Sequence, residues 1–334
     1  MTTPEMGVPM GSVVAVVGAG PCGLAAAIAL TKAGFHPIVF DKGGICASIM
    51  AYPVYTTFHS TPERLSIGGM PFAIALEKPT RRDALAYYRS LVAHFGFEVR
   101  QYEAVERIER TDRSFVLHSR PRGGETRRTL ADAVVVATGC FGTPNRLGVP
   151  GEDLPHVTHD YREGHEAFQR HVLVVGGGNS AVESALDLFR SGAHVTLVHM
   201  GAHIDDGVKS WIRPDIENRI RRGEIVARWN SRVLGIGPAQ AHLDTPEGQL
   251  NVPAEHVYLL TGYRPDSSLL VSLGVTVDAT TGVPSHDPAT MKTNVPGVYL
   301  AGVLTAGFKA NRVFIENGRD HGDVLAHALV VGSR

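Results

Sequence analysis

Residues 13–32 read VVAVVGAGPCGLAAAIALTK, and this stretch decides the fold. An apolar, β-branched run over residues 12–17 is followed by the glycine turn GAGPCG and then by an alanine-rich segment typical of a helix. Gly34 is placed to end that helix, and His36–Phe40 supplies a second strand. The stretch therefore predicts one βαβ unit over residues 12–41.

The same pattern recurs in the middle of the chain. A strand over residues 171–175 is followed by the turn GGGNSA at 176–181, a helix over 182–190, a stop at Gly192 and a strand over 194–199. Two copies of one unit indicate two dinucleotide-binding domains. The expected fold class is therefore α/β, with two Rossmann-like domains.

The glycines of the first turn have the G-x-G-x-x-G spacing at Gly18, Gly20 and Gly23. In this pattern the first glycine permits the tight turn, the second lets the backbone approach a pyrophosphate, and the third lets the helix pack on the strand. The phosphates lie at the helix N-terminus, where unpaired N–H groups favour an anion. Asp41 follows at the distance expected of a carboxylate that binds a ribose hydroxyl. We expect dinucleotide binding here.

The second turn has Gly176, Gly178 and Ala181 at the three positions, and alanine is allowed at the third. Its second strand ends in His-Met-Gly at 199–201, without the acidic residue that indicates NAD. No arginine is present there to bind a 2′-phosphate, but Lys209 and Arg213 follow shortly. We therefore favour NADPH over NADH, although both bases are also interpretable as solvated helix residues.

Other segments complete the expected architecture. Residues 81–95 predict an amphipathic helix with an apolar face of Leu85, Tyr88, Leu91, Val92 and Phe95. Residues 99–130 predict an antiparallel meander, 134–136 a buried strand, and 148–153 (GVPGED) a turn-rich boundary. The remaining expected elements are a helix over 209–222, strands near 225–228, 256–260 and 298–301, and a last helix over 318–330.

Composition limits the functional class. The 334 residues suffice for about two domains. With 43% hydrophobic and 19% charged residues, the chain is globular rather than disordered. Lys plus Arg total 32 against 33 acidic residues, so no broad basic field for nucleic acid or membrane is expected. The one long apolar stretch, residues 13–30, is interrupted by the glycine turn, which argues against a membrane span.

The chain has three cysteines, Cys22, Cys46 and Cys140, and no CxxC pair. This number favours free thiols in a reducing cytoplasm. The N-terminal residues before Gly11 carry no Lys or Arg, which argues against a secretory signal. Histidine clusters at 199–205 and 156–160 do not resemble a closed zinc site, and no metal is expected.

The chain resembles the flavoprotein reductases of thioredoxin-reductase type and, within them, the YpdA-type bacillithiol disulfide reductases. The resemblance spans residues 12–325. It rests on GAGPCGL (18–24), FHSTPERLSIGGMPF (58–72), KPTRRDALAYYR (78–89), ATG (137–139), PNRLGVPGEDLP (144–155), GGGNSAVESAL (176–186), TGYRPD (261–266), TNVPGVYLAGV (293–303) and FIENGRDHG (314–322).

This resemblance implies FAD in a discontinuous domain of residues 1–152 and 262–334, and NAD(P)H in an inserted domain of residues 153–261. The chemistry implied is hydride transfer from the nicotinamide to the flavin. The expected cofactor contacts are Gly18, Gly20, Pro21, Cys22, Gly23, Asp41, Lys42, Gly44, Ser48, His59, Val105, Ala137, Thr138, Gly139, Gly176, Gly178, Asn179, Ser180, Ala181, His199, Lys209, Gly302, Val303 and Glu316.

The family places its redox cysteine in GAGPCG, which maps onto Cys22. A helix N-terminus stabilises a thiolate, but an FAD pyrophosphate at the same place would raise the pKa of the thiol. Cys22 is therefore either the catalytic thiol or a small residue that fills a crowded loop. His59 is a candidate proton donor to a leaving thiolate, or an ordinary loop histidine.

Several residues depart from the related sequences. The CxxC pair of thioredoxin reductases is absent, and Val303 stands where relatives usually have aspartate. Met200 replaces an arginine that relatives often carry, which weakens the preference for NADPH. Cys140 and Phe141 follow ATG, where aromatic residues are expected, and Cys46 is peculiar to this chain; we expect both cysteines to be inert.

The hypothesis is an FAD-dependent NADPH oxidoreductase that reduces a low-molecular-weight disulfide, bacillithiol disulfide. A bacilliredoxin-like protein is a further expected partner, and we expect a cytoplasmic homo-oligomer. Two alternatives stay open: a flavin reductase that passes electrons to ferredoxin or oxygen, and a noncatalytic sensor that uses FAD and Cys22 to report the redox state.

Overall fold

The computed structural model describes residues 8–332, and the chain packs as two compact units. Unit 1 contains the chain up to Met50, Thr56–Thr143 and the chain from Arg264, and unit 2 contains Ala51–Tyr55 and Pro144–Tyr263. Each unit has a five-stranded parallel sheet and a three-stranded antiparallel sheet. The predicted α/β class, with two Rossmann-like domains and the second inserted into the first, is confirmed. The domain limits at 152 and 262 stay a prediction.

The parallel sheet of unit 1 has the order β16-β7-β1-β2-β3. Its strands are β1 (Val13–Val17), β2 (His36–Phe40), β3 (Glu98–Arg100), β7 (Ala133–Val136) and β16 (Val298–Leu300). The helices α1 (Pro21–Lys32) and α9 (His321–Gly332) pack closely against each other. A Cβ at Gly322 would come within 2.7 Å of the carbonyl oxygen of Ala25, so this glycine permits the contact.

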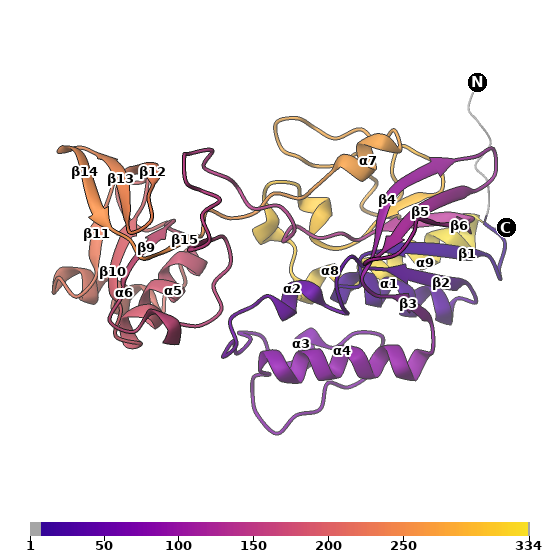
Figure 1. Ribbon diagram of the computed structural model, residues 1–334. Coiled ribbons are helices and arrows are strands. Elements are labelled where there is room, and N and C mark those ends of the chain that lie inside the picture. Colours follow the sequence, from indigo (N-terminus) through magenta and orange to yellow (C-terminus); the bar gives the residue numbers. More distant parts are fainter. Residues whose placement is uncertain (1–7, 333–334) are drawn as a thin grey trace. The chain divides into compact units, whose positions relative to one another are not determined.

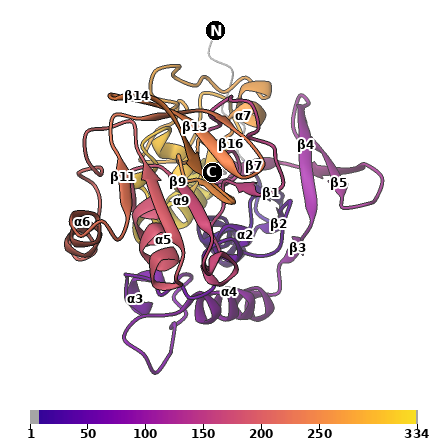
Figure 2. The same cartoon turned by 60° about the vertical axis from the view of Figure 1, so that its left-hand side comes forward.

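The antiparallel sheet of unit 1 consists of β4 (Glu103–Arg110), β5 (Phe115–Pro121) and β6 (Arg127–Ala131). β4 and β5 form a long ribbon at the side of the parallel sheet (Figure 2). The predicted meander began too early, at 99, because β3 belongs to the parallel sheet instead. The chain turns between the two sheets at Tyr102, whose φ is 54°.

The helix α4 (Arg81–Phe95) has the predicted limits and begins with a capping box. Thr80 Oγ1 accepts from Asp83 N (3.2 Å), and Asp83 Oδ2 accepts from Thr80 N (2.9 Å). The predicted apolar face was partly wrong. Ala84, Tyr87, Tyr88 and Leu91 are buried, whereas Leu85, Val92 and Phe95 are only partly buried.

The hydrogen bonds of two tyrosine hydroxyls explain why the buried face of α4 differs from the predicted one. Tyr88 donates to the carbonyl oxygen of Leu65 (3.0 Å), and Tyr87 donates to that of Met70 (2.8 Å). The helix thereby holds the segment that follows α3 (Pro62–Leu65). The FHST sequence of residues 58–61 leads directly into this segment.

The parallel sheet of unit 2 has the order β11-β10-β9-β15-β8. Its strands are β8 (Val157–Thr158), β9 (His171–Val175), β10 (His194–Val198), β11 (Val226–Arg228) and β15 (His256–Leu259). The helices α5 (Asn179–Arg190) and α6 (Arg213–Arg221) cover one face, and the antiparallel strands β12 (Arg232–Ile236), β13 (Gln240–Thr245) and β14 (Gly248–Pro253) cover the other (Figure 1).

Sequence analysis missed or misplaced several elements of unit 2 and of the C-terminal region. The strands β12–β14 were not predicted, and the helix expected from 209 begins only at Arg213, with Pro214 in its first turn. The last predicted helix, over 318–330, corresponds to α9, and the short helix α8 (Ile315–Gly318) before it was not predicted. The remaining short helices are α2 (Ala47–Met50), α7 (Ser268–Ser272), η1 (His165–Ala167), η2 (Gly302–Ala306) and η3 (Ala310–Arg312).

Between Val8 and Gly332, none of the helices has the length and apolar character required to cross a lipid bilayer.

Replacing Thr80 by alanine is expected to lower the free energy of unfolding by about 1 kcal/mol, because the N–H of Asp83 in the first turn of α4 loses its acceptor, Thr80 Oγ1. Urea denaturation measures this change. Thr126→Ala, at an exposed position of the same unit, is the control. Equal losses in both variants would contradict the assigned role of the capping box.

Candidate functional site

The three glycines of the first turn have three different surroundings. A Cβ at Gly18, whose φ is +116°, would lie 2.3 Å from the carbonyl oxygen of Ala137. A Cβ at Gly23 would lie 1.9 Å from the carbonyl oxygen of Gly18, whereas a Cβ at Gly20 would meet no atom within 4 Å. The first and third glycines therefore permit packing, and the second leaves an open cradle. This arrangement fits a dinucleotide pyrophosphate.

The cradle lies where the strand order of the sheet reverses. Val17 and Val136 are register partners on β1 and β7, so the loops that follow these strands are neighbours. Ala137 N donates to the carbonyl oxygen of Val17 (2.8 Å), Thr138 is exposed, and Gly139 has φ +73° with open space where a Cβ would be. Ligands of open α/β sheets bind at such a switch point.

The N-terminus of α1 is open to an anion. Its N-cap is Gly20, no side chain caps it, and its first turn holds no acidic residue. Pro21 occupies the first turn, where its missing N–H costs nothing. The following N–H groups and the helix dipole favour a phosphate.

Asp41 fixes the shape of this turn. Its Oδ2 accepts from Ala19 N (2.7 Å), and its Oδ1 accepts from Gly43 N (2.7 Å). The carboxylate thus anchors the glycine loop in addition to the ribose contact expected of it. Of the residues predicted to follow it, Lys42 is exposed, Gly44 is buried and Ser48 is half-buried.

The thiol of Cys22 lies against two glycines from the C-terminal part of unit 1. A Cβ at Gly302 would come within 3.2 Å of Cys22 Sγ, and one at Gly318 within 2.8 Å. Burial, followed by the carboxylates of Glu316 and Asp320, raises the pKa of Cys22 to about 12. Near neutral pH the residue is therefore a thiol, because these effects outweigh the position at a helix N-terminus.

Glu316 and His321 lie in the same part of unit 1. Ser60 Oγ donates a short hydrogen bond to Glu316 Oε1, which ties the FHST segment to α8. Gly302 N donates to His321 Nδ1 (3.1 Å), so the proton of the neutral ring is assigned to Nε2. Burial lowers the pKa of His321, and the charge of His286 contributes in the same direction. His321 belongs to the stretch FIENGRDHG (314–322), but it was not among the predicted site residues.

Three other predicted residues lie outside this group. His59 is exposed, although its neighbour Ser60 is bonded to Glu316. Val105 is half-buried against the core at an irregularity of β4, and Val303 is half-buried in η2. The structure therefore brings together Cys22, Gly302 and Glu316 but leaves the side chain of His59 at the surface.

The other two cysteines are enclosed. Cys46 is fully buried with φ 55°, and burial raises its pKa well above the usual range. Burial also raises the pKa of Cys140 to about 11. Neither forms a disulfide, and Cys22 is likewise free. Both environments disfavour the reactive thiolate.

The second glycine turn occupies the corresponding place in unit 2. Val175 and Leu259 are register partners on β9 and β15. A Cβ at Gly176, whose φ is +142°, would lie 2.4 Å from the carbonyl oxygen of Leu260. The same Cβ would be 3.1 Å from Cβ of Ala181, so alanine still fits the third position.

The polar residues predicted around this turn contact one another and acidic side chains. Asn179 Oδ1 accepts from Lys209 N (3.0 Å), and Lys209 Nζ lies 2.6 Å from Glu183 Oε1. The His199 ring covers Gly177, and its Nε2 is 3.3 Å from Asp205 Oδ1. Gly178 and Ser180 lie at the start of α5, which has no side-chain cap and no acidic residue in its first turn; a Cβ at Gly178 would lie 3.5 Å from Asp205 Oδ2.

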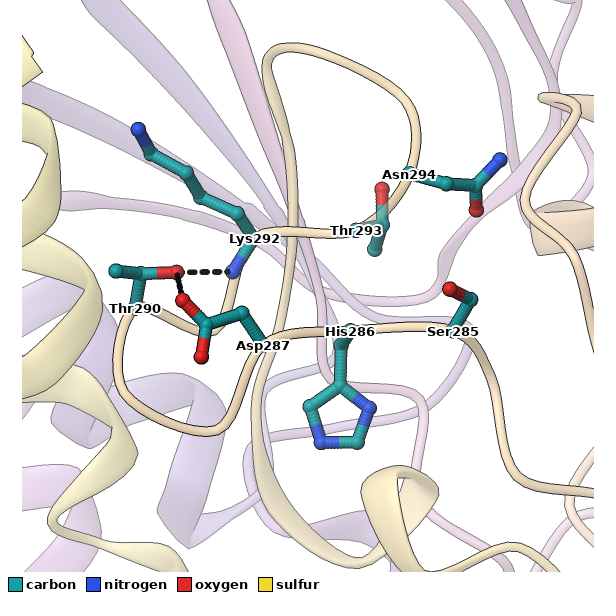
Figure 3. A pocket seen from close by; sticks show the side chains of 7 residues that line it. All are labelled: Ser285, His286, Asp287, Thr290, Lys292, Thr293 and Asn294. Atoms are coloured by element: carbon teal, nitrogen blue, oxygen red, sulfur yellow. Dashed lines mark hydrogen bonds between the residues drawn. The ribbon is translucent and has the colours of Figure 1, made fainter.

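Neither a metal position nor the polar hollow of unit 1 involves these residues. Within the described chain, no group of three or more His, Cys, Asp and Glu side chains is arranged around a metal position. An open polar hollow of about 370 Å³ in unit 1 is lined by Ser285, His286, Asp287, Thr290, Lys292, Thr293 and Asn294 (Figure 3). Thr290 Oγ1 donates to Asp287 Oδ2 (2.8 Å) there, so these groups stabilise their own turn.

Comparison with known proteins identifies the family. Residues 15–302 match the family described as pyridine nucleotide-disulphide oxidoreductase. The chain belongs to this family. It is 41% identical to the bacilliredoxin reductase Bdr of Bacillus subtilis (strain 168), over 93% of this chain and 95% of the relative.

A solved structure is similar over nearly the whole chain. The bacillithiol disulfide reductase Bdr (YpdA) from Bacillus cereus aligns with a TM-score of 0.93 at 40% identity, covering 96% of this chain and 99% of that one. A ferredoxin–NADP reductase of Ignicoccus hospitalis is more distant, at 30% identity over 87% of this chain and 89% of the relative.

The resemblance to the YpdA-type reductases is thereby confirmed. The protein is a disulfide reductase of the pyridine nucleotide-disulphide oxidoreductase family, and membership of this family implies FAD and NADPH as cofactors. The open cradle at Gly20 and the uncapped N-termini of α1 and α5 fit two such dinucleotides.

Two glycine variants are expected to separate cofactor binding from folding. Gly20→Ala adds a Cβ into open space, so the fold persists while the pyrophosphate cradle is partly filled and FAD occupancy falls. Gly23→Ala forces a Cβ onto the carbonyl of Gly18 and is expected to destabilise the protein by at least about 2 kcal/mol.

The ratio of flavin to protein absorbance measures occupancy, and urea denaturation of the flavin-free protein measures stability. Normal flavin content in Gly20→Ala would argue against the cradle. Unchanged stability in Gly23→Ala would argue against the close packing.

Proposed function

We propose that this protein is an FAD-dependent NADPH reductase of a low-molecular-weight disulfide, with bacillithiol disulfide as the substrate. The overall reaction consumes NADPH, one proton and the disulfide, and yields NADP⁺ and two thiols. The observation that carries the proposal is the similarity, over nearly the full length, to the bacillithiol disulfide reductase of Bacillus cereus.

In this proposal FAD binds the residues predicted within 1–152 and 262–334, and NADPH binds those within 153–261. Bound FAD supplies two-electron transfer from NADPH to the disulfide. The protein's own part is to hold the two dinucleotides at their glycine turns and to handle the substrate sulfurs. The open helix N-termini of α1 and α5 support the two binding sites.

Cys22 is the proposed sulfur nucleophile. Attack of its thiolate on one substrate sulfur forms a mixed disulfide and releases the first thiol; two electrons and a proton then release the second. The thiol must first lose its proton, because the surroundings raise its pKa to about 12. Glu316 is the proposed acceptor of that proton. The charge of its carboxylate contributes to the raised pKa of Cys22, and a hydrogen bond from Ser60 Oγ fixes its position. His59 is the proposed donor to the leaving thiolate.

A bacilliredoxin-like protein is a second proposed substrate. The name of the Bacillus subtilis relative, a bacilliredoxin reductase, supports it. Ferredoxin reduction has weaker support, because that relative is 30% identical rather than 41%. Three cysteines without a disulfide support a reducing, cytoplasmic location. We also propose that the protein forms a homo-oligomer.

Purified protein with FAD is expected to oxidise NADPH when bacillithiol disulfide is added under anaerobic conditions, and NADPH absorbance follows the reaction. Cys22→Ser is expected to lower kcat about 100-fold or more, whereas Cys140→Ser leaves kcat unchanged. A rate of NADPH oxidation that does not change when bacillithiol disulfide is added would contradict the proposed substrate. Full turnover by Cys22→Ser would contradict the role of the thiol but not that of FAD.

The raised pKa of Cys22 predicts slow alkylation that accelerates with pH. In a Cys46→Ser, Cys140→Ser background, the iodoacetamide rate at Cys22 is expected to rise continuously up to about pH 10, because only the thiolate reacts. Glu316→Gln removes a neighbouring negative charge, so the rate at a fixed pH should increase. A plateau near pH 8 would show that the pKa is not raised.

A further inference from the structure

The two glycine turns differ at their middle glycine, the one that lets the backbone approach the pyrophosphate of a dinucleotide. A Cβ at Gly20, in the turn of unit 1, would meet no atom within 4 Å. A Cβ at Gly178, in the turn of unit 2, would lie 3.5 Å from Oδ2 of Asp205. A carboxylate therefore borders the place of the pyrophosphate in unit 2, whereas the same place in unit 1 is open.

The backbone of Asp205 is fixed against this turn. Asp205 N donates to the carbonyl oxygen of Gly177 (2.9 Å). The carbonyl oxygen of Asp205 accepts from Val208 N (3.0 Å) and from Arg213 Nη2 (2.7 Å). The main chain cannot leave the turn without breaking these bonds, so the carboxylate can be displaced only by rotation of its own side chain.

The surroundings of the carboxylate allow this rotation. The side chain of Asp205 is 55% exposed, whereas that of its neighbour His199 is 12% exposed. The His199 ring is enclosed by two glycines: a Cβ on Gly177 would come within 2.4 Å of it, and one on Gly201 within 2.6 Å. His199 Nε2 lies 3.3 Å from Asp205 Oδ1. The carboxylate thus has a fixed neighbour on the side of the turn and solvent on the other side.

The negative charge of Asp205 is not balanced by a lysine or arginine. In the part of the chain that the structure describes, its ion-pair partner is the His199 ring, which is uncharged unless it is protonated. The bases predicted for nucleotide binding pair with other acids. Lys209 Nζ is 2.6 Å from Glu183 Oε1, and Arg213 Nη1 is 3.4 Å from an oxygen of Glu217.

A pyrophosphate at the start of α5 is therefore subject to two opposing effects. The N–H groups and the dipole of the helix attract it. A carboxylate a few ångströms away repels its two negative charges, and salt screens this repulsion only in part because the groups are so close. Removal of the carboxylate leaves the attraction alone.

We propose that the Asp205 carboxylate weakens the binding of NADPH at the second glycine turn by repelling its pyrophosphate, and that it turns towards solvent when the nucleotide binds. Asp205 thereby sets the concentration of NADPH at which the turn is half-occupied. The proposal rests on the use of NADPH in the proposed function, but it concerns nucleotide affinity alone and does not require that disulfide reduction occur.

Isothermal titration of the full-length FAD-loaded protein with NADP⁺ tests the proposal, because FAD occupies the first turn and NADP⁺ does not reduce the flavin. Asp205→Asn removes the charge and keeps the size of the side chain. It is expected to tighten NADP⁺ binding about threefold to thirtyfold at low salt, and the gain should shrink as salt is added. Asp205→Glu keeps the charge and should not tighten binding.

A second ligand locates the effect. Adenosine 2′-monophosphate keeps the adenosine and the 2′-phosphate of NADP⁺ but has no pyrophosphate, and competition with NADP⁺ measures its affinity. Asp205→Asn should change this affinity less than about twofold. Asp206→Asn is the matched control, because Asp206 is exposed, directly follows Asp205, and its substitution changes the net charge equally. It should alter neither affinity appreciably.

Three outcomes would overturn the proposal: unchanged or weaker NADP⁺ binding in Asp205→Asn, an equal gain for adenosine 2′-monophosphate, or an equal gain in Asp206→Asn. Weaker binding in Asp205→Asn would assign the carboxylate a favourable contact with the nucleotide instead. Absence of NADP⁺ binding in the wild type and in every variant would overturn the proposed use of NADPH as well. Tighter binding in Asp205→Asn without any disulfide reduction would contradict the proposed substrate and leave the role of Asp205 intact.

Discussion

The close approach of a helix to the strand before it is the constraint on which the fold of unit 1 depends. No side chain fits between the start of α1 and the carbonyl of Gly18, where a Cβ on Gly23 would lie at 1.9 Å. This contact draws the N-terminus of the helix over the end of β1 and leaves the side at Gly20 open. Unit 2 is less tight, since Ala181 occupies the third position. One packing contact therefore both closes the βα turn and directs the N–H groups of the helix towards a ligand.

The sequence predicted the parts of the fold that depend on local chemistry. Each βαβ unit was found because the apolar strands, the glycine spacing and the helix between them all lie within about thirty residues of sequence. The strands β12–β14 were missed because each is short and contains polar residues. Which of their residues face the core is decided only when they pack against the parallel sheet. The buried face of α4 differs from the predicted one because Tyr87 and Tyr88 are oriented by carbonyl groups on another segment. Helix periodicity does not encode such contacts.

The candidate site divides in the same way. The glycines and Asp41 are recognisable from spacing alone, and their surroundings fit the roles expected of them. His321 was not recognised, because it matters only through Gly302 N, a neighbour in space that lies 19 residues earlier in the sequence. Lys209 was recognised from its position, but its contact with Glu183 could not be read from the sequence.

The slot between Gly302 and Gly318 has a consequence for the durability of Cys22. Peroxide oxidises a thiolate far more readily than a thiol, and further oxidation adds oxygen atoms around the sulfur. Burial, with the carboxylates of Glu316 and Asp320, raises the pKa of the thiol and keeps the sulfur protonated, and the two glycine backbones leave little space beside it. A raised pKa and little free space beside the sulfur both disfavour further oxidation of this cysteine. The low intrinsic reactivity of the resting thiol thus serves to preserve it.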